Sequence, residues 1–219
     1  GLGLRRRGRW DTIVDTKACL IADEKINAVL EELRSFFVGC DAFDVRKHSG
    51  TFRYAVVRST ERESSVSLVL NADSPLLAAA IEKCQAFARR SSAANVLVTR
   101  VPRISEVSVS PDFFVVKGSP WLRTEYHGRQ IAYHVQGFFQ TNHSLARQMH
   151  DYCRTIFSGY PTKEGYLLDL FGGVGMFSVL HSALFKEAWV IENDPFAVAG
   201  AEKNVRENAL TNVHIIPHD

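Results

Sequence analysis

The residues best suited to chemistry lie around a glycine-rich turn in the second half of the chain. Residues 167–177 read as an apolar strand, a glycine turn at 172–175 and the start of a helix. Gly173 and Gly175 would let the backbone approach a ligand at the carboxyl end of the strand. Asp169 precedes the turn. Its charge would repel a pyrophosphate and attract a ligand with a positive amino acid end, such as S-adenosylmethionine.

Two more acids follow the next predicted strands. Glu192 ends the second apolar strand, and Asp219 follows the third. An acid in the place of Glu192 accepts hydrogen bonds from ribose hydroxyls in NAD and in S-adenosylmethionine alike, so it predicts a ribose without choosing the cofactor. In methyltransferase folds a polar residue in the place of Asp219 can meet the adenine amino group. Plainer interpretations stay open: Asp169 caps the next helix, and Glu192 is a solvated loop acid.

The glycine pattern bears on the choice of cofactor. A dinucleotide-binding turn usually shows G-x-G-x-x-G, with the pyrophosphate on the helix N-terminus. Ser178 stands three residues after Gly175, where that pattern has its last glycine. Together with Asp169, this speaks against a nicotinamide-dependent oxidoreductase, which we keep as a rival.

The elements around these residues alternate between helix and strand. Apolar strands are predicted at 166–171, 188–191 and 213–216, with helices between them, and Asp194-Pro195 opens the second of these helices. A further helix starts after Asn142. One apolar face of it is marked by Leu145, Met149, Cys153 and Ile156. This alternation is typical of parallel βαβ units, with helices on both faces of the sheet.

The first half of the sequence predicts an α+β domain. Strands are expected at 10–15, 53–58, 65–70 and 95–100, with several short strands within 104–135. Helices are expected over 22–37, capped by Asp23 or its predecessor, and after Ser74, a candidate N-cap followed by proline. We therefore expect an N-terminal α+β central domain (1–130), followed by the first part of a Rossmann-like S-adenosylmethionine-dependent methyltransferase fold (131–219).

Composition excludes several classes of protein. The chain has 219 residues and a net charge of +2. It has no apolar run of about 18 residues, so we expect no membrane span and a cytoplasmic location. Its four cysteines include no C-x-x-C pair, so a self-contained zinc site is not expected. Arg5, Arg6, Arg7 and Arg9 cluster near the start. Such a cluster is usually a solvated face, and RNA contact is the less common interpretation.

The segment 136–142 carries the most specific pattern. Gln140 follows Phe138 and Phe139, just before the helix that Asn142 is expected to cap. A packing plug with an N-cap explains Asn142 and one phenylalanine, but not Gln140 beside a second aromatic. Five segments resemble the family of RNA uracil-5 methyltransferases, namely 3–9, 13–19, 52–58, 138–142 and 168–177. The resemblance is good over residues 1–60 and 136–219 and loose over 61–135.

The resemblance implies an S-adenosylmethionine-dependent enzyme that forms 5-methyluridine in transfer RNA or large-subunit ribosomal RNA, with RNA as its partner. It implies cofactor contacts at Gln140, Phe171, Glu192 and Asp219. It also places Cys19 where several members have the last of four cysteine ligands to a [4Fe-4S] cluster. One thiolate cannot hold such a cluster, so we expect it only in a longer parent protein. We also expect a monomer.

Departures from the family pattern limit the assignment. Met176 stands where many members have a polar residue that contacts the cofactor. The family's nucleophilic cysteine and late glutamate base follow the third strand, and none of the four cysteines here has the nucleophile's context. We therefore assign no catalytic residue and expect a fragment that is inactive alone. The alternatives are a methyltransferase acting on another substrate and a non-catalytic RNA-binding module.

Overall fold

The computed structural model describes residues 2–218, and the chain divides into two compact units. Residues up to 59 and residues 63–120 form the first unit, and residues 60–62 with those from 121 onward form the second. The sequence places a boundary at residue 130, which lies within β8 (Arg129–His134). β8 belongs to the second unit because it pairs with β7 (Trp121–Tyr126) and packs on α5 (Pro195–Glu207). Separate roles for the two parts of the chain stay a prediction.

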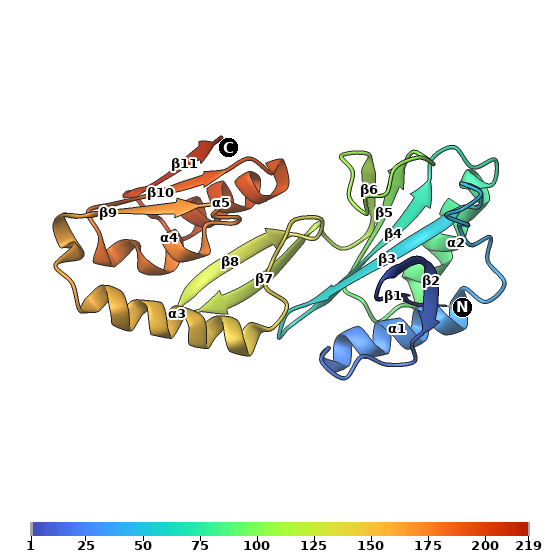
Figure 1. Cartoon of the computed structure of the whole chain (residues 1–219), viewed down its shortest axis with the longest axis horizontal. Coiled ribbons are helices and arrows are strands. Elements are labelled where there is room, and N and C mark those ends of the chain that lie inside the picture. Colours follow the sequence, from blue (N-terminus) through green and yellow to red (C-terminus); the bar gives the residue numbers. More distant parts are fainter. Residues whose placement is uncertain (1, 219) are drawn as a thin grey trace. The chain divides into compact units, whose positions relative to one another are not determined.

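The first unit is built on a mixed sheet with the strand order β3-β4-β5-β6 (Figure 1). Its strands are β3 (Phe52–Ser59), β4 (Ser64–Asn71), β5 (Asn95–Val101) and β6 (Phe113–Lys117). β4 and β5 are parallel and are connected by α2 (Leu77–Arg90), whereas the outer pairs are antiparallel. α1 (Glu24–Phe36) and α2 share one core with alternate residues of β4 and β5.

The predicted starts of these two helices are partly correct. The Asp23 carboxylate accepts a hydrogen bond from the Ile26 N–H (2.9 Å), so Asp23 caps α1 as predicted. The prediction that Ser74 caps α2 is wrong, because Leu76 occupies that position without a side-chain cap. Ser74 instead forms a turn that delays the helix: its carbonyl accepts from the Leu77 N–H (3.2 Å) and its hydroxyl from the Leu76 N–H (3.1 Å).

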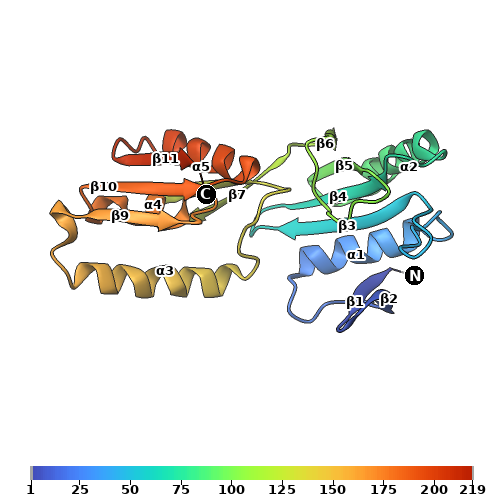
Figure 2. The same cartoon turned by 45° about the horizontal axis from the view of Figure 1, so that its top comes forward.

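A two-stranded hairpin of β1 (Gly3–Arg6) and β2 (Arg9–Asp15) lies beside α1 (Figure 2). The sequence predicts β2 but not β1, because the arginine-rich stretch shows no apolar alternation. Arg34 on α1 holds the base of the hairpin. Its guanidinium donates to the Asp15 carboxylate (2.9 Å) and to the Leu2 carbonyl (3.2 Å).

The second unit contains a sheet of three parallel strands, as the sequence predicts. Their order is β11-β10-β9. β9 (Tyr166–Leu170), β10 (Glu187–Glu192) and β11 (Val213–Pro217) alternate with α4 (Met176–His181) and α5. α3 (His143–Ser158) precedes them, and 3-10 turns span Thr162–Glu164 and Ser182–Leu184. The side chains of Asn142 and Asp194 cap α3 and α5, as predicted.

The prediction that helices cover both faces of this sheet is wrong for the described residues. Val179 of α4 and Ala201 of α5 both lie on the face of Val190, whereas Leu168 and Leu170 on the opposite face are exposed. The three strands follow one another in one direction across the sheet. Right-handed crossovers therefore return both helices to the same face.

The apolar face predicted on α3 is not its buried face. Leu145 and Ile156 are exposed, whereas Ala146 and His150 are buried. The His150 ring packs on the ring of Phe177 in α4, with centroids 4.6 Å apart. Because a histidine lies on the packed face of α3, the spacing of apolar residues does not identify that face. Across residues 2–218, no helix is long and apolar enough to cross a membrane.

Candidate functional site

The carboxyl end of β9 carries Asp169, one of the predicted cofactor ligands. Its side chain is buried and accepts hydrogen bonds from the Ser178 N–H (3.2 Å) and hydroxyl (3.0 Å) in the first turn of α4. Gly175 at the N-cap of α4 has no side chain that could do this. The interpretation of Asp169 as a helix cap therefore describes its present contacts, whereas its role toward a ligand stays a prediction.

The environment of Asp169 raises the pKa of its carboxyl group. Burial raises the pKa of its carboxyl to about 6, although the two Ser178 hydrogen bonds act in the opposite direction. The negative charge of nearby Glu192 adds to the increase. A positive group placed between these two acids would relieve both the burial cost and the repulsion. The pair is therefore electrostatically suited to a cationic ligand.

Glu192 ends β10 and binds the glycine turn directly. Its carboxylate accepts hydrogen bonds from three backbone N–H groups, those of Gly173, Asn193 and Asp194, each at 2.9 Å. Glu192 is also only half-exposed, so it is not a freely solvated loop acid. Each carboxylate oxygen has two lone pairs. Oε1 already accepts two of these bonds and Oε2 accepts one, so one acceptor position remains on Oε2 for a ribose hydroxyl.

The backbone of the turn adopts conformations that glycine favours. Gly173 and Gly175 have φ angles of +56° and +75°. A Cβ on Gly172 would lie 2.7 Å from a methyl carbon of Val190, whereas a Cβ on Gly173 would meet nothing within 4 Å. The space in front of Gly173 is therefore open to a ligand. Phe171 also has a positive φ (+54°), and 86% of its surface is exposed at the tip of β9.

The segment 136–142 passes the first turn of α5. A Cβ on Gly137 would lie 3.7 Å from Cβ of Phe196, which follows Glu192 by four residues. Phe139 is buried and its ring stacks on Tyr133, with centroids 4.0 Å apart, so it is a packing residue. Gln140 is exposed.

Two further predicted ligands are Asp219 and Cys19. Asp219 lies outside the described residues. Cys19 is half-buried, and Asn27 holds its backbone by donating to the carbonyl (3.0 Å) and accepting from the N–H (2.8 Å). No group of three histidine, cysteine or acidic side chains in residues 2–218 could hold a metal ion. Residues 2–218 therefore do not fit an iron–sulfur cluster.

Sequence reasoning missed Asn204, which positions the turn from behind. This side chain is fully buried in α5, and its amide N–H donates to the Val174 carbonyl in the glycine turn (3.0 Å). The same amide pairs with Ala132 on β8. The available signal was the repeat of asparagine at Asn204 and Asn208, one helical turn apart on a predicted helix.

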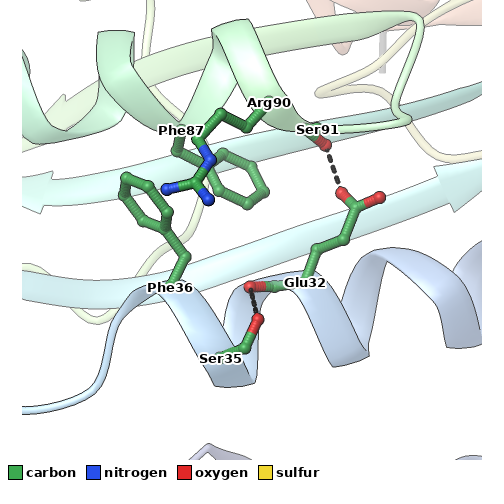
Figure 3. A pocket seen from close by; sticks show the side chains of 6 residues that line it. All are labelled: Glu32, Ser35, Phe36, Phe87, Arg90 and Ser91. Carbon is green, nitrogen blue, oxygen red and sulfur yellow. Dashed lines mark hydrogen bonds between the residues drawn. The ribbon is translucent and has the colours of Figure 1, made fainter.

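The first unit has a hollow of about 310 Å³ between α1 and α2 (Figure 3). Phe36, Phe87 and Arg90 line one side, with the guanidinium 5.8 Å from the centroid of Phe36. On the other side the Glu32 carboxylate accepts from the Ser91 hydroxyl (2.6 Å). Its polar groups serve to join the two helices, and none of the predicted ligands lines it.

This chain is similar to one known family and to several proteins named as RNA methyltransferases. A sequence profile of the family tRNA (Uracil-5-)-methyltransferase matches residues 11–218. An uncharacterized RNA methyltransferase of Chlorobaculum tepidum is 28% identical over 216 residues, covering 96% of this chain and 44% of that protein. Another, from Caldanaerobacter subterraneus, is 25% identical over 223 residues, covering 100% of this chain and 49% of that protein.

The fold of this chain is also found in a solved structure. It is that of the Pyrococcus abyssi tRNA (uracil-54, C5)-methyltransferase in complex with S-adenosyl-L-homocysteine. The TM-score is 0.75 at 21% identity, and the match covers 99% of this chain and 52% of that one. The likeness shows a common mixed α/β fold. This chain thus spans about half the length of the proteins that it matches.

Proposed function

Because the chain belongs to the tRNA (uracil-5-)-methyltransferase family, we propose that it supplies the cofactor-binding part of an S-adenosylmethionine-dependent enzyme that forms 5-methyluridine in RNA. The observation that carries the proposal is the pair of acids on neighbouring strands. Glu192 binds the N–H of Gly173 and interacts electrostatically with buried Asp169, around a left-handed turn with open space in front of it.

The chemistry of these residues fits S-adenosylmethionine, which supplies an electrophilic methyl group on a sulfonium when bound. Glu192 is suited to accept a hydrogen bond from a ribose hydroxyl on Oε2, which keeps one lone pair. Asp169, in its ionised form, is suited to the positive amino acid end. Exposed Phe171 offers a ring at the edge of the pocket, and Gln140 and Asp219 stay predicted ligands from neighbouring segments.

One of two neighbouring phenylalanines is the better candidate for stacking on an RNA base. Phe138 and Phe139 are both candidates for stacking on a flipped uridine or its neighbours. Phe139 is already stacked on Tyr133, whereas 71% of the surface of Phe138 is exposed. We therefore propose Phe138 for this role. No catalytic nucleophile or base is assigned among the residues of this chain.

The cofactor assignment is tested by calorimetric titration of the chain with S-adenosylhomocysteine and, separately, with NADH. We expect one S-adenosylhomocysteine site and no NADH binding. Glu192→Gln should weaken S-adenosylhomocysteine binding roughly tenfold or more, because a charged acceptor is lost. Glu187→Gln, on the same strand, is the matched control and should leave the affinity unchanged. Equal losses in both variants would remove Glu192 from the site.

The substrate assignment needs a separate measurement. Fluorescence anisotropy with a uridine-containing RNA stem-loop reports RNA binding independently of the cofactor. Binding of S-adenosylhomocysteine without RNA binding would favour a methyltransferase acting on another substrate. RNA binding without S-adenosylhomocysteine binding would favour a non-catalytic RNA-binding module.

A further inference from the structure

The tip of the β1–β2 hairpin concentrates positive charge on a narrow ribbon. Arg5, Arg6, Arg7 and Arg9 fall within five consecutive positions, and all four side chains are exposed. Gly8 sits among them with a φ of +73°, which allows the tight turn between the strands. A Cβ on Gly8 would meet nothing within 4 Å, so the tip projects into open space.

The hairpin is held firmly at its base and side. Arg34 of α1 binds the Asp15 carboxylate (2.9 Å) and the carbonyls of Leu2 and Thr16. Arg46 binds Asp11 on β2. These contacts come from two separate segments of the first unit, and they fix the ribbon without occupying its end.

Arg53 of the first unit differs from the arginines at the hairpin tip in how its side chain is bonded. Arg53 is used structurally, because it donates to the carbonyls of Pro102 and Arg103 (3.0 Å each) and its guanidinium lies 4.0 Å from the centroid of Phe43. At the tip, by contrast, the side chains of Arg6 and Arg7 have no hydrogen-bond or ion-pair partner among residues 2–218.

The two arginines that flank this pair are already engaged. Arg5 donates to the Tyr54 hydroxyl (2.7 Å), and its guanidinium is 5.6 Å from the ring centroid. Arg9 reaches Asp11 at 3.7 Å, and Asp11 also binds Arg46. The Asp11 carboxylate is therefore shared by two other cations. Arg6 and Arg7 keep their full complement of donors for an outside partner.

We propose that the tip of the β1–β2 hairpin is an RNA contact, in which Arg6 and Arg7 bind phosphate groups of the substrate backbone. The inference rests on the proposed function, which makes RNA the polyanion that this protein meets. Guanidinium groups match phosphate oxygens through paired N–H donors. An anchored ribbon with a free end loses little conformational entropy on binding, which favours a defined contact over a loose basic tail.

The test compares the full chain with Arg6→Gln/Arg7→Gln in binding a fluorescent RNA stem-loop across a salt series. We expect binding to weaken roughly tenfold near physiological salt. The slope of log K against log salt should fall by about 1.4 to 1.8, because two phosphate contacts are lost. Arg89→Gln/Arg206→Gln removes the same charge from two exposed helical positions and is the matched control. It should change the slope much less.

Several results would overturn the inference. They are a slope and affinity equal to those of the parent chain, an equal loss in the control variant, or no RNA binding by the parent. A loss of binding to anionic lipid vesicles without a loss on RNA would instead identify a membrane surface as the partner. Titration of S-adenosylhomocysteine into the same variants judges the cofactor assignment separately, because neither variant changes a residue that we assign to the cofactor.

Discussion

Asn204 pairs with the backbone of Ala132 as a neighbouring strand would. Its Oδ1 accepts from the Ala132 N–H (2.7 Å), and its Nδ2 donates to the Ala132 carbonyl (3.0 Å). One turn later, Asn208 makes the same two bonds with Gln130, at 3.1 and 2.7 Å. Four residues of helix rise about 6 Å and two residues of strand about 6.6 Å, so the two amides match alternate positions of β8.

This arrangement predicts different costs for two asparagine substitutions. Asn204→Leu should lower the free energy of unfolding by roughly 2–4 kcal/mol, because it leaves buried backbone groups of Ala132 and Val174 without partners. Asn208→Ala should cost about 1 kcal/mol, because the groups around Asn208 are closer to solvent. Urea unfolding of both variants measures the difference. An equal loss of unfolding free energy in the two variants would contradict this difference between Asn204 and Asn208.

Two adjacent substitutions in the glycine turn should have different effects, one mainly on stability and the other mainly on cofactor binding. Gly172→Ala should destabilise the second unit, because the new Cβ would lie 2.7 Å from a Val190 methyl carbon and 2.9 Å from the Asp169 carbonyl oxygen. Gly173→Ala faces open space but keeps a φ of +56°, a strain of about 1–2 kcal/mol. Its larger effect should be on S-adenosylhomocysteine binding. Thermal unfolding and calorimetry on the two variants distinguish the effects.

Asp169 predicts a cofactor affinity that rises with pH. Burial raises its pKa to about 6, so the carboxyl is mostly protonated at pH 5 and ionised at pH 7.5. A ligand ammonium group needs the ionised form, so S-adenosylhomocysteine should bind more tightly at pH 7.5. Asp169→Asn should remove most of this dependence in calorimetric titrations. A dependence unchanged in the variant would place the ammonium group elsewhere.

The same group has the opposite effect on stability without ligand. Its pKa in the folded chain lies above the unfolded value of 3.8, so the folded state favours the protonated form. Its contribution to stability is therefore complete below pH 3.8 and is lost as the pH rises through about 6. In Asp169→Asn this loss should be absent from urea midpoints measured between pH 4 and pH 7.

Local signals in the sequence were enough for much of the fold. Apolar runs bounded by turns located the three strands of the parallel sheet, and cap residues placed the starts of α1, α3 and α5. Such features depend on residues within one turn of each other. The glycine turn belongs to the same class, because its strand, turn and helix are consecutive.

Features that depend on distant partners were not predictable from the pattern. The three backbone bonds of Glu192 join the end of one strand to the turn after another, and the sequence showed only an acid at a strand end. The Ala132 partner of Asn204 is 72 positions away. The packed face of α3 was missed because a histidine occupies it. The roles of Gln140 and Asp219 toward a cofactor stay predictions.

That histidine, His150, forms a buried pair with His181 that predicts loss of stability in mild acid. The two side chains are almost fully buried, with 3.4 Å between Nδ1 of His150 and Nε2 of His181, and Phe177 packs on the rings. Burial lowers the pKa of each histidine to about 4. The charged groups around the pair work against one another. Asp151 raises both pKa values and His127 lowers both, whereas His150 and Arg154 lower that of His181.

Because the folded pKa values lie below the unfolded value of about 6.5, the unfolded chain binds more protons in mild acid. The stabilisation is therefore complete above pH 6.5 and is lost as the pH falls toward 4. Urea unfolding should show roughly 2–4 kcal/mol less stability at pH 5 than at pH 7.5 from this pair.

Asp169 acts in the opposite direction over this range, so the informative quantity is the difference between variant and parent. His150→Phe should flatten the acid loss, whereas His48→Asn, at an exposed position, should not. The same acid loss in His150→Phe as in the parent would exclude the pair as its source.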